Sequence, residues 1–363
     1  MISSRLMLKV LPIIFCLVSL SHGLNGHTAR FVTVSPLFQT WRMQANPDFS
    51  QFSTVVFSQM PLKPDLSLAL RIGEANIGGN VSSLNGITDL QSMLSYYLRG
   101  SNTTLNFGLN LPSGTKNLSQ DQFSTSSIMS RNIFSLQVPN FSQGLNISAG
   151  ATRVFIVSET VVIGIGSSYL LKGKYKPLEN LDDYDPGNEF LLNIGADFRL
   201  NSSSSISSDL ILNWYGTDNL AGQKIFSPGN KMVLSTRYRK YLRFDDLTLH
   251  MLVRLRGKSD LVVDDNLVTE DQKTLPNQLE FYGRYSDYFN RRLTLVYLAE
   301  IRFHQVTLNP YSGASLFGLG FQPKTKISER VYLTGYLRYR FGHIKNGYRI
   351  RGYEMGIGVE FGF

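Results

Sequence analysis

The chain has 363 residues, a formal net charge of +9, 23 Phe, 18 Tyr and a single cysteine, Cys16. After the first twenty-odd residues no apolar run approaches the ~18 residues of a membrane-spanning helix, which excludes a helical membrane protein. A basic chain often binds nucleic acid, but the export signal described next argues against a nucleic-acid partner.

The first 23 residues have the pattern of a secretory signal peptide. A positively charged start precedes an apolar run from Leu11 to Leu20, and small residues follow at Ser21 and Gly23. This order predicts cleavage and export. The run is shorter than the ~20 residues that cross a bilayer as a helix, which disfavours a membrane anchor. Without Cys16 the exported chain has no disulfide to form.

Residues 24–363 alternate between apolar and polar side chains in segments typical of β-strands. The predicted strands are 30–42, 51–60, 65–75, 87–99, 103–111, 144–155, 159–172, 188–200, 205–216, 230–243, 246–258, 277–289, 291–305, 313–324, 329–342 and 350–363. The first two are the weakest, because both alternate poorly and Pro36 interrupts one of them.

Short and long connections between these segments alternate along the chain. Tight turns such as "VSET" (157–160) and "FDD" (244–246) alternate with polar stretches, which are 43–50, 76–86, 112–143, 173–187, 217–229, 259–276, 306–312 and 343–349. This rhythm predicts one all-β domain over 24–363, a transmembrane antiparallel up-and-down β-barrel of about 14–16 strands with both ends on one side. A β-sandwich would have shorter strands, with long and short connections at both ends.

One face of each segment is apolar, and a soluble core of such broad sheets would lack helices to cover it. In one strand the face comprises Leu247, Leu249, Met251, Val253 and Leu255. Lipid covers such a face without help, and closing the sheet removes its edges. We therefore expect the cell outer membrane as the location and its lipid and lipopolysaccharide as partners.

The last strand, "GYEMGIGVEFGF", alternates in full. Its apolar positions are Tyr353, Met355, Ile357, Val359, Phe361 and Phe363. The segment resembles the C-terminal strand of Gram-negative outer-membrane barrels. That resemblance implies an assembly signal read by the barrel-assembly machinery.

The stretch 85–119, "NGITDLQSMLSYYLRGSNTTLNFGLNLPSGTKNLS", resembles the phenol-degradation meta-pathway outer-membrane proteins, which are similar in style to long-chain fatty-acid transporters. The resemblance rests on Gly86 to Asp89, on "YDPGNE" at 184–189 and on a family-like loop. The loop residues are Leu111, Pro112, Ser113 and Gly114, with Ser where the family has Thr. The resemblance implies uptake of small, largely hydrophobic compounds. As local structure alone, both motifs are strand ends and turns.

The positive charge falls out of phase with the apolar positions of the later strands. The predicted lumen and solute-pathway residues are Arg237, Arg239, Arg254, Arg256, Arg284, Arg302, Arg338 and Arg340. An arginine facing lipid at mid-membrane would cost about 2–4 kcal/mol, which favours the lumen. A basic wall favours anions. The alternative is a structural ladder with Glu280, Glu300 and the loop carboxylates Asp264, Asp265, Glu270 and Asp271.

The connection 112–143 is too long for a simple turn. Ser119 and Gln122 have capping-box spacing, which predicts a short helix from Gln120 toward Arg131. Two placements remain open: the segment folds into the barrel mouth and narrows it, or it lies outside as a surface loop.

The sequence gives little support for catalysis, so we expect no enzyme. None of His250, His304 and His343 is followed closely by a serine, as outer-membrane phospholipases require, and no metal-ligand spacing or phosphate-binding glycine loop is present. We expect no cofactor and no metal. The prediction is a passive channel for small solutes, with hydrophobic or aromatic carboxylates as the compromise between resemblance and charge. The alternative is a non-transport barrel serving adhesion, envelope structure or loop-based hydrolysis.

Overall fold

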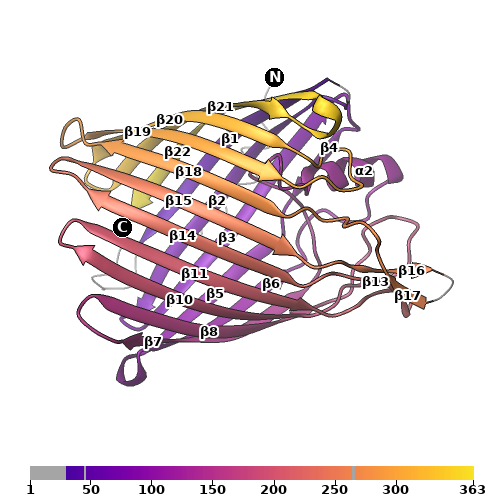
Figure 1. Cartoon of the computed structure of the whole chain (residues 1–363), viewed down its shortest axis with the longest axis horizontal. Helices are drawn as coiled ribbons and strands as arrows, with labels where there is room; N and C mark the ends of the chain where they lie inside the picture. The colour runs from indigo at the N-terminus through magenta and orange to yellow at the C-terminus, as the bar shows by residue number, and fades with distance from the viewer. Residues whose placement is uncertain (1–29, 45, 264–265) are drawn as a thin grey trace.

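A computed structural model describes residues 30–44, 46–263 and 266–363. The predicted signal peptide at 1–23 lies outside these residues. The chain forms a closed antiparallel β-barrel of sixteen strands that run up and down in sequence order (Figure 1). In the described part of the chain, no helix is long and apolar enough to span a membrane.

The elements of the barrel wall agree in number and order with the sequence prediction. They are β1 (Phe31–Met43), β2 (Phe49–Lys63), β3 (Leu66–Gly79), β4 (Leu84–Ile87) continued by β5 (Leu90–Leu98), β6 (Thr103–Leu111), β7 (Asn146–Ile156), β8 (Val161–Lys172), β10 (Glu189–Asn201), β11 (Ser204–Tyr215), β14 (Lys231–Tyr241), β15 (Asp245–Arg256), β18 (Gln278–Asp287), β19 (Leu293–His304), β20 (Ser315–Ser328), β21 (Val331–His343) and β22 (Arg349–Gly362). The predicted fold class is confirmed.

The barrel closes where β22 pairs with β1. Their register runs from Phe31 opposite Gly362 to Met43 opposite Ile350, and it is interrupted at Ser35 and Pro36. Proline has no backbone N–H to donate. On its other side Pro36 keeps its place in the register with β2. A strand that looks weak in sequence therefore serves as the seam of the barrel.

The two ends of the barrel differ. Tight turns lie at the end where β1 begins and β22 stops, which we call the short-turn end. The opposite, long-loop end carries the longer connections. They contain β9 (Tyr184–Asp185), β12 (Asp218–Leu220), β13 (Gln223–Ser227), β16 (Asp260–Val263), β17 (Asn266–Thr269), α2 (Gln120–Met129) and η2 (Lys345–Gly347), while η1 (Arg99–Ser101) is a short turn.

Two expectations about these connections were wrong. The stretches 173–187, 217–229 and 259–276 are not plain loops, because their strands pair into a separate five-stranded sheet at the long-loop end (Figure 1). The connection predicted at 76–86 is only four residues long, because β3 continues to Gly79 and β4 begins at Leu84.

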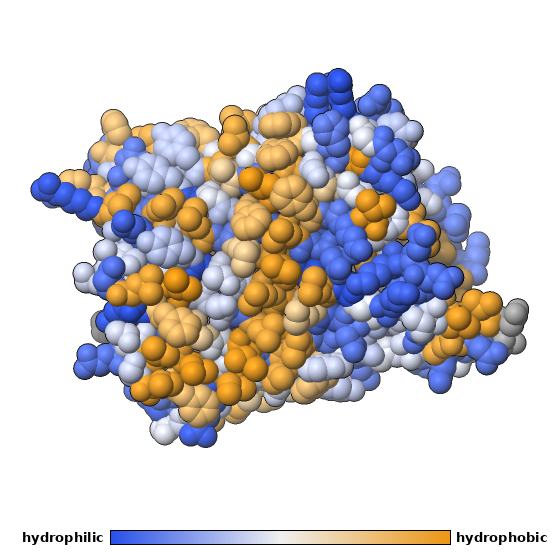
Figure 2. Space-filling view, in the orientation of Figure 1, coloured by the Kyte–Doolittle hydropathy of each residue, from blue (hydrophilic) through white to orange (hydrophobic). Residues whose placement is uncertain are grey.

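The outer face of the wall is apolar, as the alternation predicts. Leu249, Tyr297 and Leu337 have 47%, 45% and 60% of their surface exposed. An apolar band crosses this face, and hydrophilic residues gather beside it toward the long loops (Figure 2). Aromatic side chains contact one another near both ends of the strands: Tyr297 packs on Phe321 at 5.5 Å, and Phe317 on Phe341 at 5.9 Å.

The seam can be tested with a disulfide, because Cys16 is the only native cysteine. Thr33 lies opposite Glu360 across the seam. With Cys16→Ser as background, we expect Thr33→Cys with Glu360→Cys to oxidise to an intramolecular bond, since directly opposed strand residues have suitable Cα separations. Thr33→Cys with Gly356→Cys, four residues out of register, is the control. Equal crosslinking of both pairs, measured by mass spectrometry, would contradict the closure.

Candidate functional site

The side chains that point into the barrel are unevenly charged. Along β14–β22 the register brings every predicted lumen arginine into the inward set: Arg237 lies opposite His250, Arg284 opposite Leu298, and Arg340 opposite Gly318. The wall from β6 to β8 has small and neutral residues at inward positions, such as Asn106 opposite Gly150. The interior therefore has a basic side and a neutral side.

Three of the predicted arginines form a buried ion-pair cluster. Arg340 donates from Nε to Glu300 Oε1 at 2.5 Å and from Nη1 to Glu354 Oε2 at 3.0 Å. Arg338 lies 3.8 Å from Glu300 and 4.0 Å from Glu354. Arg302 lies 3.7 Å from Glu300. These contacts are those of the structural ladder that the sequence left open as the alternative. Glu354 also belongs to the ladder, although the sequence did not single it out.

The other arginines are held differently. Arg254 hydrogen-bonds Gln278, and Arg256 donates to the Tyr215 hydroxyl at 3.3 Å. Arg239 approaches Asp246 only to 3.9 Å. Among the described residues, neither Arg237 nor Arg284 has a carboxylate within ion-pair distance.

Glu270, one of the loop carboxylates in the structural-ladder alternative, binds groups of its own loop rather than a lumen arginine. Glu270 is buried and accepts hydrogen bonds from the backbone N–H of Ser259 and Thr274, both at 2.9 Å, and from the Thr274 hydroxyl at 2.6 Å. It therefore braces its own loop. Asp264 and Asp265 lie outside the described residues.

A cavity of about 370 Å³ opens on the basic side of the wall. Arg237, Arg239, Arg284 and Arg338 line it, together with Glu300. The cavity lies nearer to the short-turn end than Arg302 does. Its residue Arg284 is paired with Leu298, which precedes Arg302 by four residues on β19, and β19 begins at the short-turn end. This cavity joins four of the predicted lumen residues in one place.

The 112–143 connection contributes a segment that packs against the inner wall, which we call the plug segment (residues 131–143). Helix α2 precedes it, and the capping box between Ser119 and Gln122 is present as predicted. Arg302 Nη1 on β19 donates to Ser135 Oγ at 2.6 Å. Gly73 on β3 lies against the plug residue Val138. The segment thus reaches between well-separated strands of the barrel.

Two glutamines of the wall bind the plug segment through its backbone. Gln39 accepts from the N–H of Gln137 at 2.8 Å and donates to the carbonyl of Ser135 at 3.2 Å. Gln51 accepts from the N–H of Val138 at 3.2 Å and donates to the carbonyl of Val138 at 2.7 Å. A primary amide that donates and accepts at once imitates a neighbouring strand. These contacts satisfy backbone groups that would otherwise be buried without partners.

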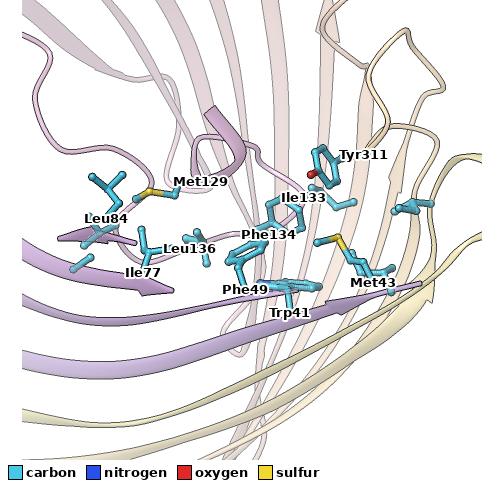
Figure 3. Packing of buried hydrophobic residues seen from close by; sticks show 14 of the residues in the cluster. Trp41, Met43, Phe49, Ile77, Leu84, Met129, Ile133, Phe134, Leu136 and Tyr311 are labelled. Atoms are coloured by element: carbon cyan, nitrogen blue, oxygen red, sulfur yellow. The ribbon is translucent and has the colours of Figure 1, made fainter. Parts of the chain in front are cut away.

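The plug segment also has an apolar centre, Phe134 (Figure 3). Its ring is fully buried and meets Trp41, Phe49 and Tyr311 edge-on at 5.4, 4.9 and 5.4 Å. Aromatic pairs in this geometry add about 0.5–1.5 kcal/mol each beyond their buried area. Trp41 fits because Gly352 opposite it has no side chain: a Cβ there would lie 2.7 Å from the indole ring.

The family-like residues meet at the base of this connection, around Asp89. The carboxylate accepts from Gly114 N–H at 2.8 Å, from Gln143 N–H at 2.8 Å and from the Asn110 amide at 2.9 Å. One buried side chain thus fixes both the start and the end of the connection. A Cβ on Gly114 would lie 2.7 Å from this carboxylate, which explains glycine at that position.

The "YDPGNE" element also proves structural. Asp218 accepts from the Tyr184 hydroxyl at 2.5 Å and from Gly187 N–H at 2.7 Å. Burial and the neighbouring carboxylate raise the pKa of Tyr184. Glu189 pairs with Lys172 at 2.6 Å. The element therefore joins the five-stranded sheet at the long-loop end, which we call the accessory sheet, to the barrel wall.

Sequence reasoning missed several residues that organise this interior. Gln39 and Gln51 are single polar residues in strands, and nothing in their spacing marks them as binding a distant segment. Asp89 was named as part of the family-like motif, but the motif did not predict its contacts with Gly114 and Gln143. Glu354 carried a signal, because it is a charged residue out of phase with the apolar positions of the last strand. In the described ranges, no group of three or more His, Cys, Asp or Glu side chains could hold a metal ion.

The Asp89 clamp can be tested through hydrogen exchange. Hydrogen bonds to a charged group contribute about 1.5–3 kcal/mol each. We expect Asp89→Ala to speed the exchange of the Gly114 and Gln143 amides about 100-fold or more through local opening. Asp182→Ala, at an exposed aspartate of another long connection, is the matched control. Unchanged protection in the Asp89 variant would show that the clamp does not hold the connection.

No protein-family model and no curated protein matches the chain. Among solved structures, a bacterial polysaccharide outer membrane secretin is similar with a TM-score of 0.50 and 9% identity, over 93% of this chain and 100% of its own. An outer membrane channel from Pseudomonas putida F1 gives 0.41 and 10%, over 94% and 97%. An engineered Rh. blastica porin gives 0.37 and 12%, over 93% and 99%. At this identity, the likeness to the first indicates a shared β-barrel fold.

Proposed function

We propose that this protein is a passive outer-membrane channel for small organic anions. One observation carries the proposal: a closed barrel with an apolar outer face encloses a polar interior, and one side of that interior holds arginines that no described carboxylate neutralises. Such a wall raises the local concentration of anions and repels cations. Transport then needs no cofactor and no energy source beyond the solute gradient.

The membrane placement rests on the outer face. A lipid bilayer accepts only structures whose backbone groups are paired internally, and a closed barrel fulfils this condition. Outer-membrane lipid and lipopolysaccharide would cover the apolar band. In the same proposal the outward residues of β22, such as Met355 and Ile357, form the signal read by the barrel-assembly machinery, after the export signal at 1–23 has been removed.

The solute class combines two arguments. The resemblance of 85–119 to the phenol-degradation outer-membrane proteins favours small hydrophobic compounds. The unpaired guanidinium groups of Arg237 and Arg284 favour a negative charge. Aromatic or aliphatic carboxylates have both properties, because an apolar body carries a single carboxylate that arginine can bind with two parallel hydrogen bonds.

The plug segment would set the width of the path at the long-loop end. Its middle is bound by wall amides and its end at Gln143 by Asp89, so it would remain in place while solute passes. The rival function is a barrel without transport, serving adhesion, envelope structure or hydrolysis. His250 hydrogen-bonds Ser235 at 2.9 Å, but no described carboxylate orients the other ring nitrogen, as a hydrolytic triad requires.

Planar-bilayer recording tests the proposal directly. The purified, folded barrel should conduct, and in a KCl gradient its reversal potential should favour chloride, because the lumen has more cations than anions on its accessible wall. A cation-favouring reversal potential would refute the anion pathway. Absence of both conductance and solute uptake into liposomes, with barrel folding verified, would favour the non-transport rival.

Shortening the plug connection tests where the path is narrow. Replacing residues 117–140 by a Gly-Ser linker keeps Gly114 and Gln143 on Asp89 and removes the plug segment from the lumen. We expect single-channel conductance to rise severalfold, since the constriction then disappears. An equivalent replacement of 260–269 in the accessory sheet is the control and should change conductance little. An equal rise in both variants would contradict the assigned constriction.

A further inference from the structure

The 370 Å³ cavity on the basic wall has the features of a specific binding site rather than of a merely charged surface. It lies on the part of the wall formed by six successive strands, β14, β15, β18, β19, β20 and β21. Its size is at the lower end of the range of small-molecule sites, about 300–1,000 Å³. The lining therefore fits one small solute at a time.

The charges around the cavity do not balance. Its only carboxylate, Glu300, is already hydrogen-bonded to Arg340, which is buried beside the cavity. Arg338 lies 3.8 Å from Glu300, beyond hydrogen-bond distance, so its donors remain available. Arg237 and Arg284 have no carboxylate partner in the described part of the chain. An incoming anion would accept charge-assisted hydrogen bonds from these guanidinium groups.

Much of the remaining lining is apolar or aromatic. The rings of His250 and Tyr282 stack at 5.8 Å with an angle of 21° between their planes. Tyr282 is fixed by a hydrogen bond from its hydroxyl to Glu280. Leu298 adds an aliphatic side chain from the next strand. An inorganic anion would make no use of these surfaces, whereas the body of an organic acid would contact them.

Two glycines keep the cavity open. A Cβ on Gly318 would lie 2.5 Å from the Glu300 side chain, and one on Gly320 would lie 3.3 Å from both Arg338 Nε and Leu298. Any larger residue at these positions would push the charged groups away or fill the space between them. The flat backbone there can accept a planar body beside the guanidinium groups.

We propose that this cavity binds the carboxylate of a small organic acid with an aromatic or aliphatic body, through Arg237, Arg284 and Arg338, with His250, Tyr282 and Leu298 contacting the body. The inference rests on the proposed function and deepens it, since it assigns the solute a defined station. The station lies on the short-turn side of the plug segment. A solute that passes the plug would meet it before leaving the barrel.

Isothermal titration calorimetry on the full, detergent-solubilised barrel tests this site without any need for conduction. Benzoate is the probe. Benzamide, its neutral analogue of the same shape, and inorganic phosphate, an anion without an apolar body, are the comparisons. We expect saturable benzoate binding, with benzamide and phosphate each at least tenfold weaker.

A pair of variants locates the binding. Arg237→Gln with Arg284→Gln should weaken benzoate at least tenfold, and Arg237→Lys with Arg284→Lys should recover part of the loss because the charge remains. Arg199→Gln is the matched control, because Arg199 is also directed inward, on β10, but lines a different cavity. It should leave benzoate affinity unchanged. Folding of each variant is verified by the gel-mobility shift on heating.

Three results would overturn the site: no benzoate binding by the folded wild-type barrel, equal binding of benzamide or phosphate, or an equal loss in the Arg199 variant. The wild-type comparison of probes stands even if a variant fails to fold. Binding and conduction also fail separately. Benzoate binding by a barrel that does not conduct would reject the channel and retain the site, whereas an anion-selective channel that does not bind benzoate would reject the site alone.

Discussion

The backbone pairing of β22 with β1 is the constraint from which the other features of this structure follow. A closed ring has no unpaired edge, so each strand has only two environments for its side chains: outside or inside. The apolar residues occupy the outside. Polar and charged residues out of phase with them must then share the interior, and this is why the eight predicted lumen arginines, from five different strands, lie in one lumen. Their collection is a consequence of closure as much as of charge.

The interior resolves this concentration of positive charge in two ways. Glu300 and Glu354 neutralise part of it, beside Arg340 and the plug segment, where side chains are buried. Burying a charge without such a partner costs several kcal/mol, so these contacts are needed where water is excluded. Farther toward the short-turn end Arg237 and Arg284 are exposed, and no carboxylate of the described residues lies within ion-pair distance of them. Arg340, which has two carboxylate partners, is thus buried, whereas these two arginines are exposed.

The sequence allowed most of the fold to be predicted. Alternation located all sixteen strands, because the two environments of a barrel wall give a period of two. It was weakest in β1 and β2, for a reason visible in the structure: their inner faces carry Trp41, Phe49 and other residues that pack against the plug segment rather than line water. Both faces are then partly apolar, and the alternation fades.

The plug contacts and the accessory sheet could not be predicted in this way. The strands of that sheet are two to five residues long and pair only because the barrel brings their loops together. Likewise Asp89 and Gly114 are family-like residues whose meaning as a clamp depends on a contact across 25 positions of sequence. The arginine face was predictable, but the division between paired and unpaired arginines depends on which carboxylates the register places opposite them.

The glutamine contacts to the plug segment have a consequence for how such a barrel would respond to its surroundings. Gln39 and Gln51 are uncharged, and their amides neither titrate nor attract counterions. The four amide hydrogen bonds to the middle of the segment therefore do not depend directly on pH or salt, whereas the contacts of Arg302 with Ser135 and of Gln39 with Glu354 involve charged groups. A segment fastened in part by amides keeps these contacts when pH or salt changes, while the electrostatics of the charged wall beside it depend on ionic strength.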